Sequence, residues 1–202
     1  MRDGRNIRDV ESLQPDMMGF MLWDGSKRYV SSKPDYLPGV CRVGVFVNPE
    51  PEYVLAKASE LGLNRIQLHG TETAELCRRI HKLTGLPITK AISVAQASDF
   101  DICQAYEQED SVDLYLFDTK CCGWGGSGQS FDWSLLECYK GSKPFLLAGG
   151  IGPGMEESIA GIRHKRFLGI DLNSRFESEP AVKEISKLSL FINNIRNYEQ
   201  NK

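Results

Sequence analysis

The feature that most constrains the fold of this chain is a regular alternation of short apolar runs with longer amphipathic stretches. Several of the apolar runs are almost continuously hydrophobic, which is typical of strands buried on both faces of a parallel sheet. The runs predict strands at residues 17–20, 43–47, 65–68, 87–91, 114–117, 145–148 and 167–172.

Stretches with helical spacing separate these runs and carry helix start and stop signals. Residues 51–61 begin with prolines suited to a first helical turn and end before Gly62. The other helices are expected at residues 5–13, 71–83, 95–108, 132–139, 155–162 and 182–198. Each step from strand to strand spans about 20 to 30 residues, the size of one βα unit. Because no linker or low-complexity segment interrupts the repeat, we expect one α/β domain over residues 1–202.

Repeated βα units leave two architectures open, a doubly wound open sheet and a closed (β/α)8 TIM barrel. Polar residues and glycines follow many strands, namely Asn48, His69–Gly70, Asp118–Thr119, Gly149–Gly150 and Asn173–Ser174. Candidate sites at many strand ends favour the barrel over a single crevice. A barrel needs one strand more than the pattern predicts, and the chain opens with a helix. We therefore expect a (β/α)8 TIM barrel whose first β-strand is missing from this chain.

Composition argues against several classes of protein. The 24 basic and 27 acidic side chains give a net charge of −3, whereas nucleic-acid-binding domains usually carry a basic excess. No apolar run approaches the roughly 18 residues of a membrane helix, and the first ten residues lack the apolar core of a secretory signal. We expect a cytoplasmic protein that binds neither nucleic acid nor membrane.

Six cysteines are scattered along the chain without a C-x-x-C pair. A structural zinc site is therefore not expected, and a long chain without an export signal is not expected to carry a disulfide framework. We interpret the cysteines as reduced thiols, several of them buried as small hydrophobic side chains.

Two segments are candidates for binding phosphate. Gly149–Gly150 follows a strand, where main-chain N–H groups can approach an anion, and a helix expected near Met155 has its positive end there. A tight strand-to-helix turn is the alternative. Asn173–Ser174 follows the last strand, and barrels often bind phosphate between the loops after their last two strands. Residues 125–128 form a glycine-rich loop that either folds over a ligand or lies on the surface.

Four other side chains are candidates for polar roles. A carboxyl group at Asp118, just after an apolar strand, would be partly desolvated and suited to general-acid chemistry; the alternative is a cap for the following turn. Arg28 is either a bidentate clamp for a carboxylate or a solvated charge beside Lys27. Alternation puts Gln67 and His69 on one face, where the histidine is a metal ligand, an acid or a hydrogen-bonded core residue.

Taken in order, the segments that carry these residues resemble the phosphoribosylanthranilate isomerase family of tryptophan biosynthesis, whose members are (β/α)8 barrels. Each match alone is weak, but the ordered set is specific and runs from end to end. The matching segments are residues 18–20, 26–30, 42–48, 66–70, 117–119, 125–128, 131–133, 147–150 and 169–174.

The resemblance implies an Amadori rearrangement of N-(5′-phosphoribosyl)anthranilate to 1-(2-carboxyphenylamino)-1-deoxyribulose 5-phosphate, without cofactor or metal. It also implies a small phosphorylated substrate and a monomer or homodimer. The implied roles are general acid for Asp118, carboxylate binding for Arg28, a place in the substrate pocket for Gln67 and His69, and phosphate binding for Gly149, Gly150, Asn173 and Ser174.

The sequence departs from the family pattern at its start. The family's general base is a cysteine in a Lys-x-Cys-Gly-Met-like motif, and Met1–Arg2 falls where that motif finishes. We expect the strand and its cysteine to lie ahead of residue 1. The alternatives are that another base serves, such as Cys121 or Cys122, or that the chain is a non-catalytic phosphosugar-binding TIM-barrel protein. Arg175 and Ala181 also stand where the family commonly has glycine.

Overall fold

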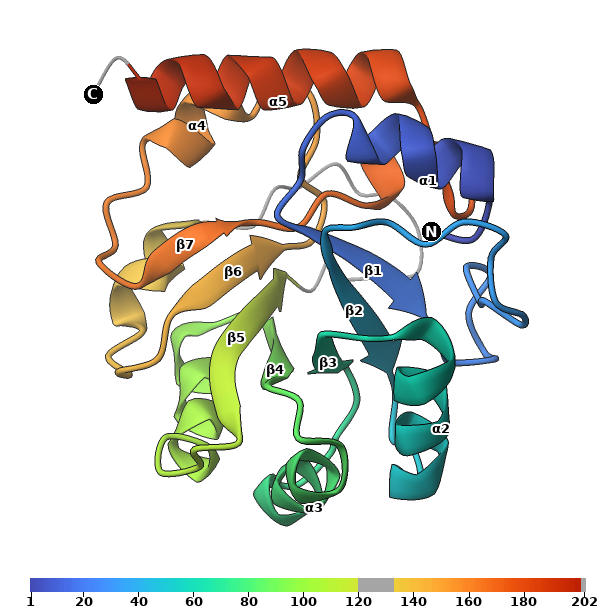
Figure 1. The fold of residues 1–202 in the computed structure, drawn as a ribbon. Helices are drawn as coiled ribbons and strands as arrows, with labels where there is room; N and C mark the ends of the chain where they lie inside the picture. The colour runs from blue at the N-terminus through green and yellow to red at the C-terminus, as the bar shows by residue number, and fades with distance from the viewer. Residues whose placement is uncertain (120–132, 201–202) are drawn as a thin grey trace.

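Seven parallel strands form one curled sheet in the computed structural model, which describes residues 1–119 and 133–200. The strands pair in chain order around a common centre, and the helices lie outside them (Figure 1). The strands are β1 Met17–Met21, β2 Cys41–Phe46, β3 Arg65–Leu68, β4 Ile88–Val94, β5 Val112–Thr119, β6 Phe145–Ala148 and β7 Phe167–Ile170. An antiparallel ribbon, β8 Glu177–Glu179 with β9 Val182–Lys183, follows β7.

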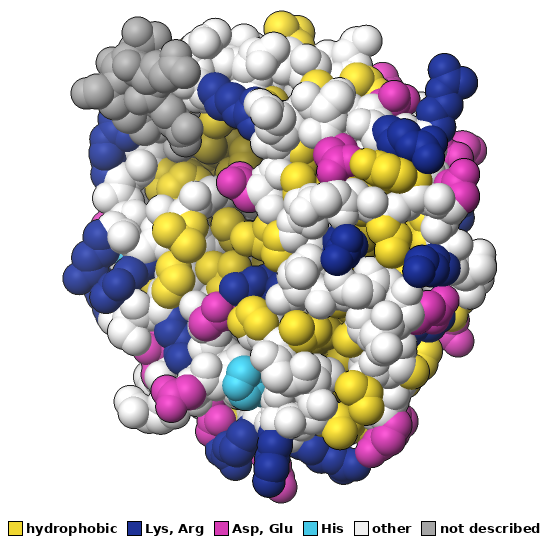
Figure 2. All heavy atoms as spheres, viewed as in Figure 1, with side chains coloured by type: hydrophobic (Ala, Val, Ile, Leu, Met, Phe, Trp, Pro, Cys, Tyr) yellow, Lys and Arg dark blue, Asp and Glu magenta, His cyan; other side chains and the backbone are white. Residues whose placement is uncertain are grey.

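The connections between strands contain α-helices and shorter 3₁₀ segments. The α-helices are α1 Gly4–Glu11, α2 Pro51–Leu61, α3 Ala74–Thr84, α4 Glu156–Ala160 and α5 Ile185–Gln200. The 3₁₀ segments are η1 Ala97–Ala105, η2 Trp133–Cys138 and η3 Ser174–Phe176. Within the described ranges, no helix is long and apolar enough to cross a membrane. On the face shown in Figure 2, basic side chains are interspersed with acidic ones.

All seven predicted strands are present, but three predicted helices differ. Residues 133–138, expected as part of a helix, form a 3₁₀ segment. Residues 97–105 form a 3₁₀ segment rather than an α-helix, and Asp99 there accepts hydrogen bonds from the main chain of Ala95 and Gln96. The bond from Gln96 is part of a capping box at the start of this segment. The last helix begins at Ile185, not residue 182, because Val182–Lys183 pairs with β8. The turn of this ribbon holds Ala181 at φ +72°, a conformation that favours the glycine common in the family.

Side-chain alternation along the strands divides the core in two. The large cluster lies between the sheet and the helices; there Phe117 packs edge-on against Phe100 and Tyr139. A small cluster of Ala91, Leu116 and Ala148 lies on the other face of the sheet. Because neighbours in a strand point to opposite faces, Asp118 shares the inner face with Leu116.

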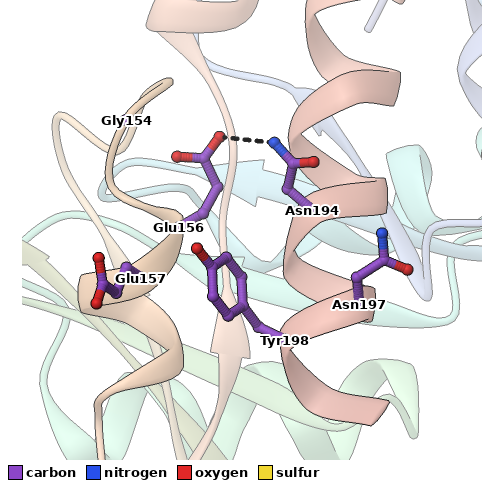
Figure 3. Close-up of a pocket in the computed structure, with 6 residues that line it drawn as sticks. All are labelled: Gly154, Glu156, Glu157, Asn194, Asn197 and Tyr198. Atoms are coloured by element: carbon purple, nitrogen blue, oxygen red, sulfur yellow. Dashed lines mark hydrogen bonds between the residues drawn. The ribbon is translucent and has the colours of Figure 1, made fainter. Parts of the chain in front are cut away.

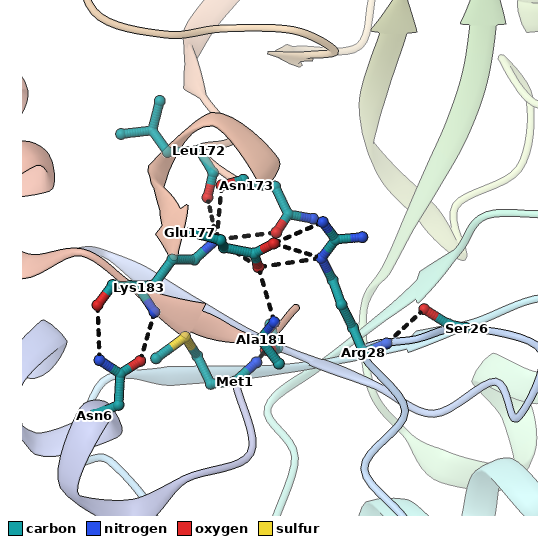
Figure 4. A network of polar contacts seen from close by, with 10 residues as sticks. Met1, Asn6, Ser26, Arg28, Leu172, Asn173, Glu177, Ala181 and Lys183 are labelled. Atoms are coloured by element: carbon teal, nitrogen blue, oxygen red, sulfur yellow. Dashed lines mark hydrogen bonds and ion pairs between the residues drawn. The ribbon is translucent and has the colours of Figure 1, made fainter. Parts of the chain in front are cut away.

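Strands β1 and β7 are the two ends of the sheet, and the described residues form no ladder between them. Polar contacts link the segments that follow these strands (Figure 4). Arg28, after β1, donates to Glu177 Oε2 from Nη2 at 2.6 Å and from Nε at 2.8 Å. Lys183 Nζ donates to Glu177 Oε1 at 3.2 Å and to Asn173 Oδ1 at 2.9 Å. Asn6 of α1 exchanges two hydrogen bonds with the main chain of Lys183.

The Glu177 carboxylate is the centre of this network. Its side chain is only 4% exposed, and burial by itself would raise the pKa of Glu177. Hydrogen bonds from Arg28 and Lys183 outweigh that effect and hold the pKa of Glu177 below its usual range. The network therefore depends on a negative charge at Glu177, which joins the two ends of the sheet.

We expect Glu177→Gln to lower the free energy of unfolding at neutral pH by about 2 kcal/mol, because Arg28 and Lys183 lose their anion. A carboxyl with a lowered folded pKa stabilises the fold above its unfolded pKa, and that contribution is lost as pH falls through the folded value. The difference in free energy of unfolding between Glu177→Gln and the parent should therefore become smaller as the pH falls. Urea unfolding at about pH 6 and about pH 3.5 measures it. Glu179→Gln, at an exposed position of the same strand, is the control; a Glu177→Gln effect that stays constant with pH would contradict the assignment.

Candidate active site

Three predicted side chains meet at the carboxyl ends of β3 and β5. His69 Nε2 lies 3.0 Å from Asp118 Oδ2, and Gln67 Nε2 lies 3.1 Å from His69 Nδ1. The amide nitrogen of Gln67 can only donate, so His69 Nδ1 accepts and the ring proton stands on Nε2. His69 therefore donates to Asp118, and the hydrogen bonds run in one direction from glutamine to carboxylate.

Strand pairing explains why these three residues lie together. In the ladders β3–β4 and β4–β5, Gln67 pairs with Thr89, and Asp118 pairs with Ser93. His69 follows β3 directly, and its main-chain N–H donates to Phe46 O of β2 at 2.8 Å. The side chains of His69 and Asp118 are 28% and 34% exposed, so a ligand can reach both.

Asp171 is a site carboxylate that we did not single out from the sequence. It follows β7 directly, and its main-chain N–H donates to Leu147 O at 2.8 Å. Burial raises the pKa of Asp171; the nearby Asp118 carboxylate adds to the rise, and Lys183 opposes it. The signal in the sequence is its place after an apolar strand, as for Asp118, in a segment whose other polar residues favour phosphate binding.

The two predicted phosphate segments lie next to each other. They follow β6 and β7, which pair through Leu147 and Ile170. Gly149 and Gly150 have φ values of +84° and +66°, a left-handed conformation that favours glycine. Lys183 Nζ donates to both the main-chain and side-chain oxygens of Asn173, at 3.1 and 2.9 Å. Ser174 begins the short η3 segment and is exposed.

The helix expected near Met155 offers little attraction for phosphate. α4 has only five residues, and its first turn carries Glu156 and Glu157. The side chain of Arg175 supplies a positive charge beside the glycine loop. A Cβ placed on Gly152 would lie 2.5 Å from Arg175 Cδ. The Arg175 side chain therefore lies across this loop, beside Ser174.

A groove of about 530 Å³ between α4 and α5 is a separate feature (Figure 3). Glu156 and Glu157 line it, and Asn194 Nδ2 lies 3.4 Å from Glu156 Oε1. Its acidic side chains would repel a phosphorylated ligand. The groove is therefore a poor candidate for such a site.

Arg28 is not simply a solvated charge. Its Nε and Nη2 donate to Glu177, and its side chain is 29% exposed. Among the described residues, no side chain or carbonyl accepts from Nη1 of Arg28. Glu177 thus fixes the plane of the guanidinium and leaves one edge for another acceptor.

The described cysteines lie away from these groups, at the start of β2 or in helical segments. They are the free thiols Cys41, Cys77, Cys103 and Cys138. Burial raises the pKa of Cys77 to about 11 and that of Cys103 to about 12, so both remain thiols at neutral pH. Cys121, Cys122 and the 125–128 loop lie outside the described residues. Within residues 1–119 and 133–200, no group of three His, Cys, Asp or Glu side chains is placed to hold a metal ion.

Two structures of known enzymes share this fold over nearly their full length. The phosphoribosylanthranilate isomerase of Thermotoga maritima is 32% identical, with a TM-score of 0.80 over 98% of this chain and 96% of that one. A phosphoribosylanthranilate isomerase in complex with reduced 1-(o-carboxyphenylamino)-1-deoxyribulose 5-phosphate is 30% identical, with a TM-score of 0.78 over 98% and 99%. The expected α/β fold of TIM-barrel type is thus confirmed.

Sequence comparison gives the same relatives. The N-(5′-phosphoribosyl)anthranilate isomerase of Phocaeicola vulgatus is 47% identical over 197 residues, which covers 97% of this chain and 95% of that protein. The enzyme of the same name from Parabacteroides distasonis is 46% identical over 202 residues, or 96% and 90%. The family described as N-(5′phosphoribosyl)anthranilate (PRA) isomerase matches residues 9–194. With strand order and sequence in agreement over nearly the whole chain, this chain belongs to the N-(5′-phosphoribosyl)anthranilate isomerase family.

Proposed function

We propose that this chain catalyses the Amadori rearrangement of N-(5′-phosphoribosyl)anthranilate to 1-(2-carboxyphenylamino)-1-deoxyribulose 5-phosphate. The observation that carries the proposal is the directed chain of hydrogen bonds from Gln67 through His69 to Asp118, at the carboxyl ends of the strands. These hydrogen bonds orient the Asp118 carboxyl group at the position where barrel enzymes carry out their chemistry.

Asp118 is the general acid of the first step. His69 donates to Oδ2, so Oδ1 is the oxygen that would carry the proton to be transferred. That proton goes to the furanose ring oxygen as the C1′–O bond breaks and the nitrogen lone pair forms the Schiff base. A base then removes the C2′ proton, and the resulting enolamine tautomerises to the ketose. Acid catalysis of this kind contributes about 10²- to 10⁴-fold in rate.

Arg28 and the two loops after β6 and β7 hold the ends of the substrate. Arg28 binds the anthranilate carboxylate through the edge of its guanidinium that Glu177 leaves open. The main chain of Gly149 and Gly150 binds the phosphate, together with Asn173 and Ser174. The chain acts on this small phosphorylated substrate as a monomer or a homodimer.

Adding the family's cysteine-bearing strand tests whether that cysteine is the base that removes the C2′ proton. Turnover of phosphoribosylanthranilate is followed by the change in anthranilate fluorescence, with residues 1–202 alone and with a Lys-x-Cys-Gly strand added ahead of Met1. Turnover by either protein supports the isomerase, and the comparison locates the base. A folded protein that binds phosphosugars without turnover in both forms would instead be the non-catalytic phosphosugar-binding barrel.

Asp118→Asn should reduce kcat by at least about 10²-fold while leaving the Kd for a product analogue within about threefold. The asparagine keeps the shape and the hydrogen bond from His69 but has no acidic proton. Steady-state kinetics and calorimetric titration of the same variant measure the two quantities. Asp113→Asn, at the start of β5, is the control, and near-parental turnover by Asp118→Asn would remove Asp118 from the acid role.

Arg28→Gln should raise KM by about 10- to 100-fold, the loss expected for a charge-assisted hydrogen bond of about 1.4 to 3 kcal/mol. A competitor whose ring lacks the carboxylate separates binding from loss of structure. The parent should prefer the carboxylated competitor, and the variant should bind both equally. Arg163→Gln, at an exposed position after α4, should behave as the parent. A preference retained by Arg28→Gln would show that another group reads the carboxylate.

A further inference from the structure

An ion pair lies buried on the helix-facing side of the sheet, behind the candidate site. Lys90 of β4 donates from Nζ to Glu72 Oε2 at 2.9 Å, and Glu72 lies in the loop between β3 and α3. The two side chains are 3% and 0% exposed. Neither touches the substrate in the proposed reaction, so their burial has another explanation.

The ammonium group of Lys90 binds the main chain on both sides of His69. Nζ donates to Gly70 O at 2.8 Å and to Leu68 O at 3.2 Å. It also contacts Ala91 O at 3.0 Å. The two residues that flank His69 are therefore tied to a single charged group on the opposite face of the strand.

The Glu72 carboxylate binds the same segment through its N–H groups. Gly70 N lies 3.0 Å from each carboxylate oxygen, and Asn48 N donates to Oε1 at 2.7 Å. Gly70 is thus held by its N–H through Glu72 and by its carbonyl through Lys90. A Cβ at Gly70 would lie 2.5 Å from Asn48 Oδ1 and 2.8 Å from Glu72 Oε1, so the fit leaves no room for a side chain.

A buried ion pair is a poor source of stability, because desolvation offsets most of the attraction between the charges. Apolar side chains would suit this face, where Ile88 and Ile92 are already buried. What an apolar pair cannot do is bind three carbonyl groups and two N–H groups of the main chain around His69. We therefore interpret the two charged side chains as groups that position the main chain near His69, and not as groups that fill the core.

We propose that Lys90 and Glu72 are positioning residues that hold the main chain at residues 68–70, so that His69 Nε2 reaches Asp118 Oδ2. The proposal deepens the proposed function and rests on the roles of His69 and Asp118 given there. Without the pair, the His69 ring loses its fixed orientation between Gln67 and Asp118. The orientation of the Asp118 proton is then lost, whereas the phosphate and carboxylate sites remain.

Lys90→Met tests this, with Lys143→Met as the matched control. Lys143 also donates to two main-chain carbonyls, Glu109 O at 2.9 Å and Val112 O at 2.6 Å, but at the amino-terminal end of β5. In the parent, nitrogen NMR should show His69 as one neutral tautomer with its proton on Nε2; His69→Gln identifies its signals among the three histidines. Lys90→Met should lose this single tautomer, and Lys143→Met should keep it.

Kinetics give the second readout, measured on whichever form of the chain turns over. Lys90→Met should lower kcat by about 10- to 100-fold with KM changed by less than about threefold, and Lys143→Met should leave both within about twofold. If Lys90→Met fails to fold, Lys90→Met/Glu72→Gln removes both charges and restores stability. That double variant should fold, yet still lack the single His69 tautomer.

A folded Lys90→Met or double variant with the parental His69 tautomer and kcat would overturn the proposal. Failure of the proposed function is distinguishable, because it appears as absence of turnover by the parent both with and without the added strand. The tautomer of His69 is read without turnover and so reports on the positioning role alone.

Discussion

Parallel pairing of consecutive strands is the constraint on which the rest of this structure depends. Seven strands paired in chain order place all of their carboxyl ends on one rim of the curled sheet. Residues at the carboxyl ends of β3, β5, β6 and β7 therefore lie close together although up to about a hundred residues separate them. Side-chain alternation then decides which of them face inward, and it puts His69 within hydrogen-bond distance of both Gln67 and Asp118.

Two buried charged networks support this rim from different sides. Glu177 and Lys183 hold Arg28 and Asn173 where β1 and β7 fail to pair, and Lys90 and Glu72 hold the segment around His69. The first network binds Arg28 and Asn173 directly, and the second binds the main chain on either side of His69. Since buried ion pairs contribute little net stability, their common property is that they fix the direction of a particular polar group. The site is thus preorganised by charges that need not touch the substrate.

Much of the fold could be predicted because its signals are local. Strand β3 begins and ends at the predicted residues, and so do β6 and α2. Apolar runs, prolines at a helix start and glycines after a helix end act within a few residues. The prediction failed where distant contacts decide: Val182–Lys183 joins a ribbon with β8 instead of the following helix. The short helix after Gly149–Gly150 carries acidic residues in its first turn, so the expected aid to phosphate binding from that helix is absent in α4.

Local signals in the sequence are enough to predict the class of fold, the strand positions and the residues at the strand ends, and its motifs indicate the isomerase family. These properties follow from hydrophobic periodicity and from motifs that are contiguous in the chain. The pairing of these groups across the molecule follows from the folded structure and not from local sequence. Glu177 lies 149 residues from Arg28, and nothing in the spacing of either residue predicts their contact. Asp171 acquires its raised pKa from burial, and Lys90 meets the carbonyls of residues 68 and 70 only because β3 and β4 pair in one register. A hydrogen bond depends on position to within a fraction of an ångström, and strand pairing, not local sequence, sets that position.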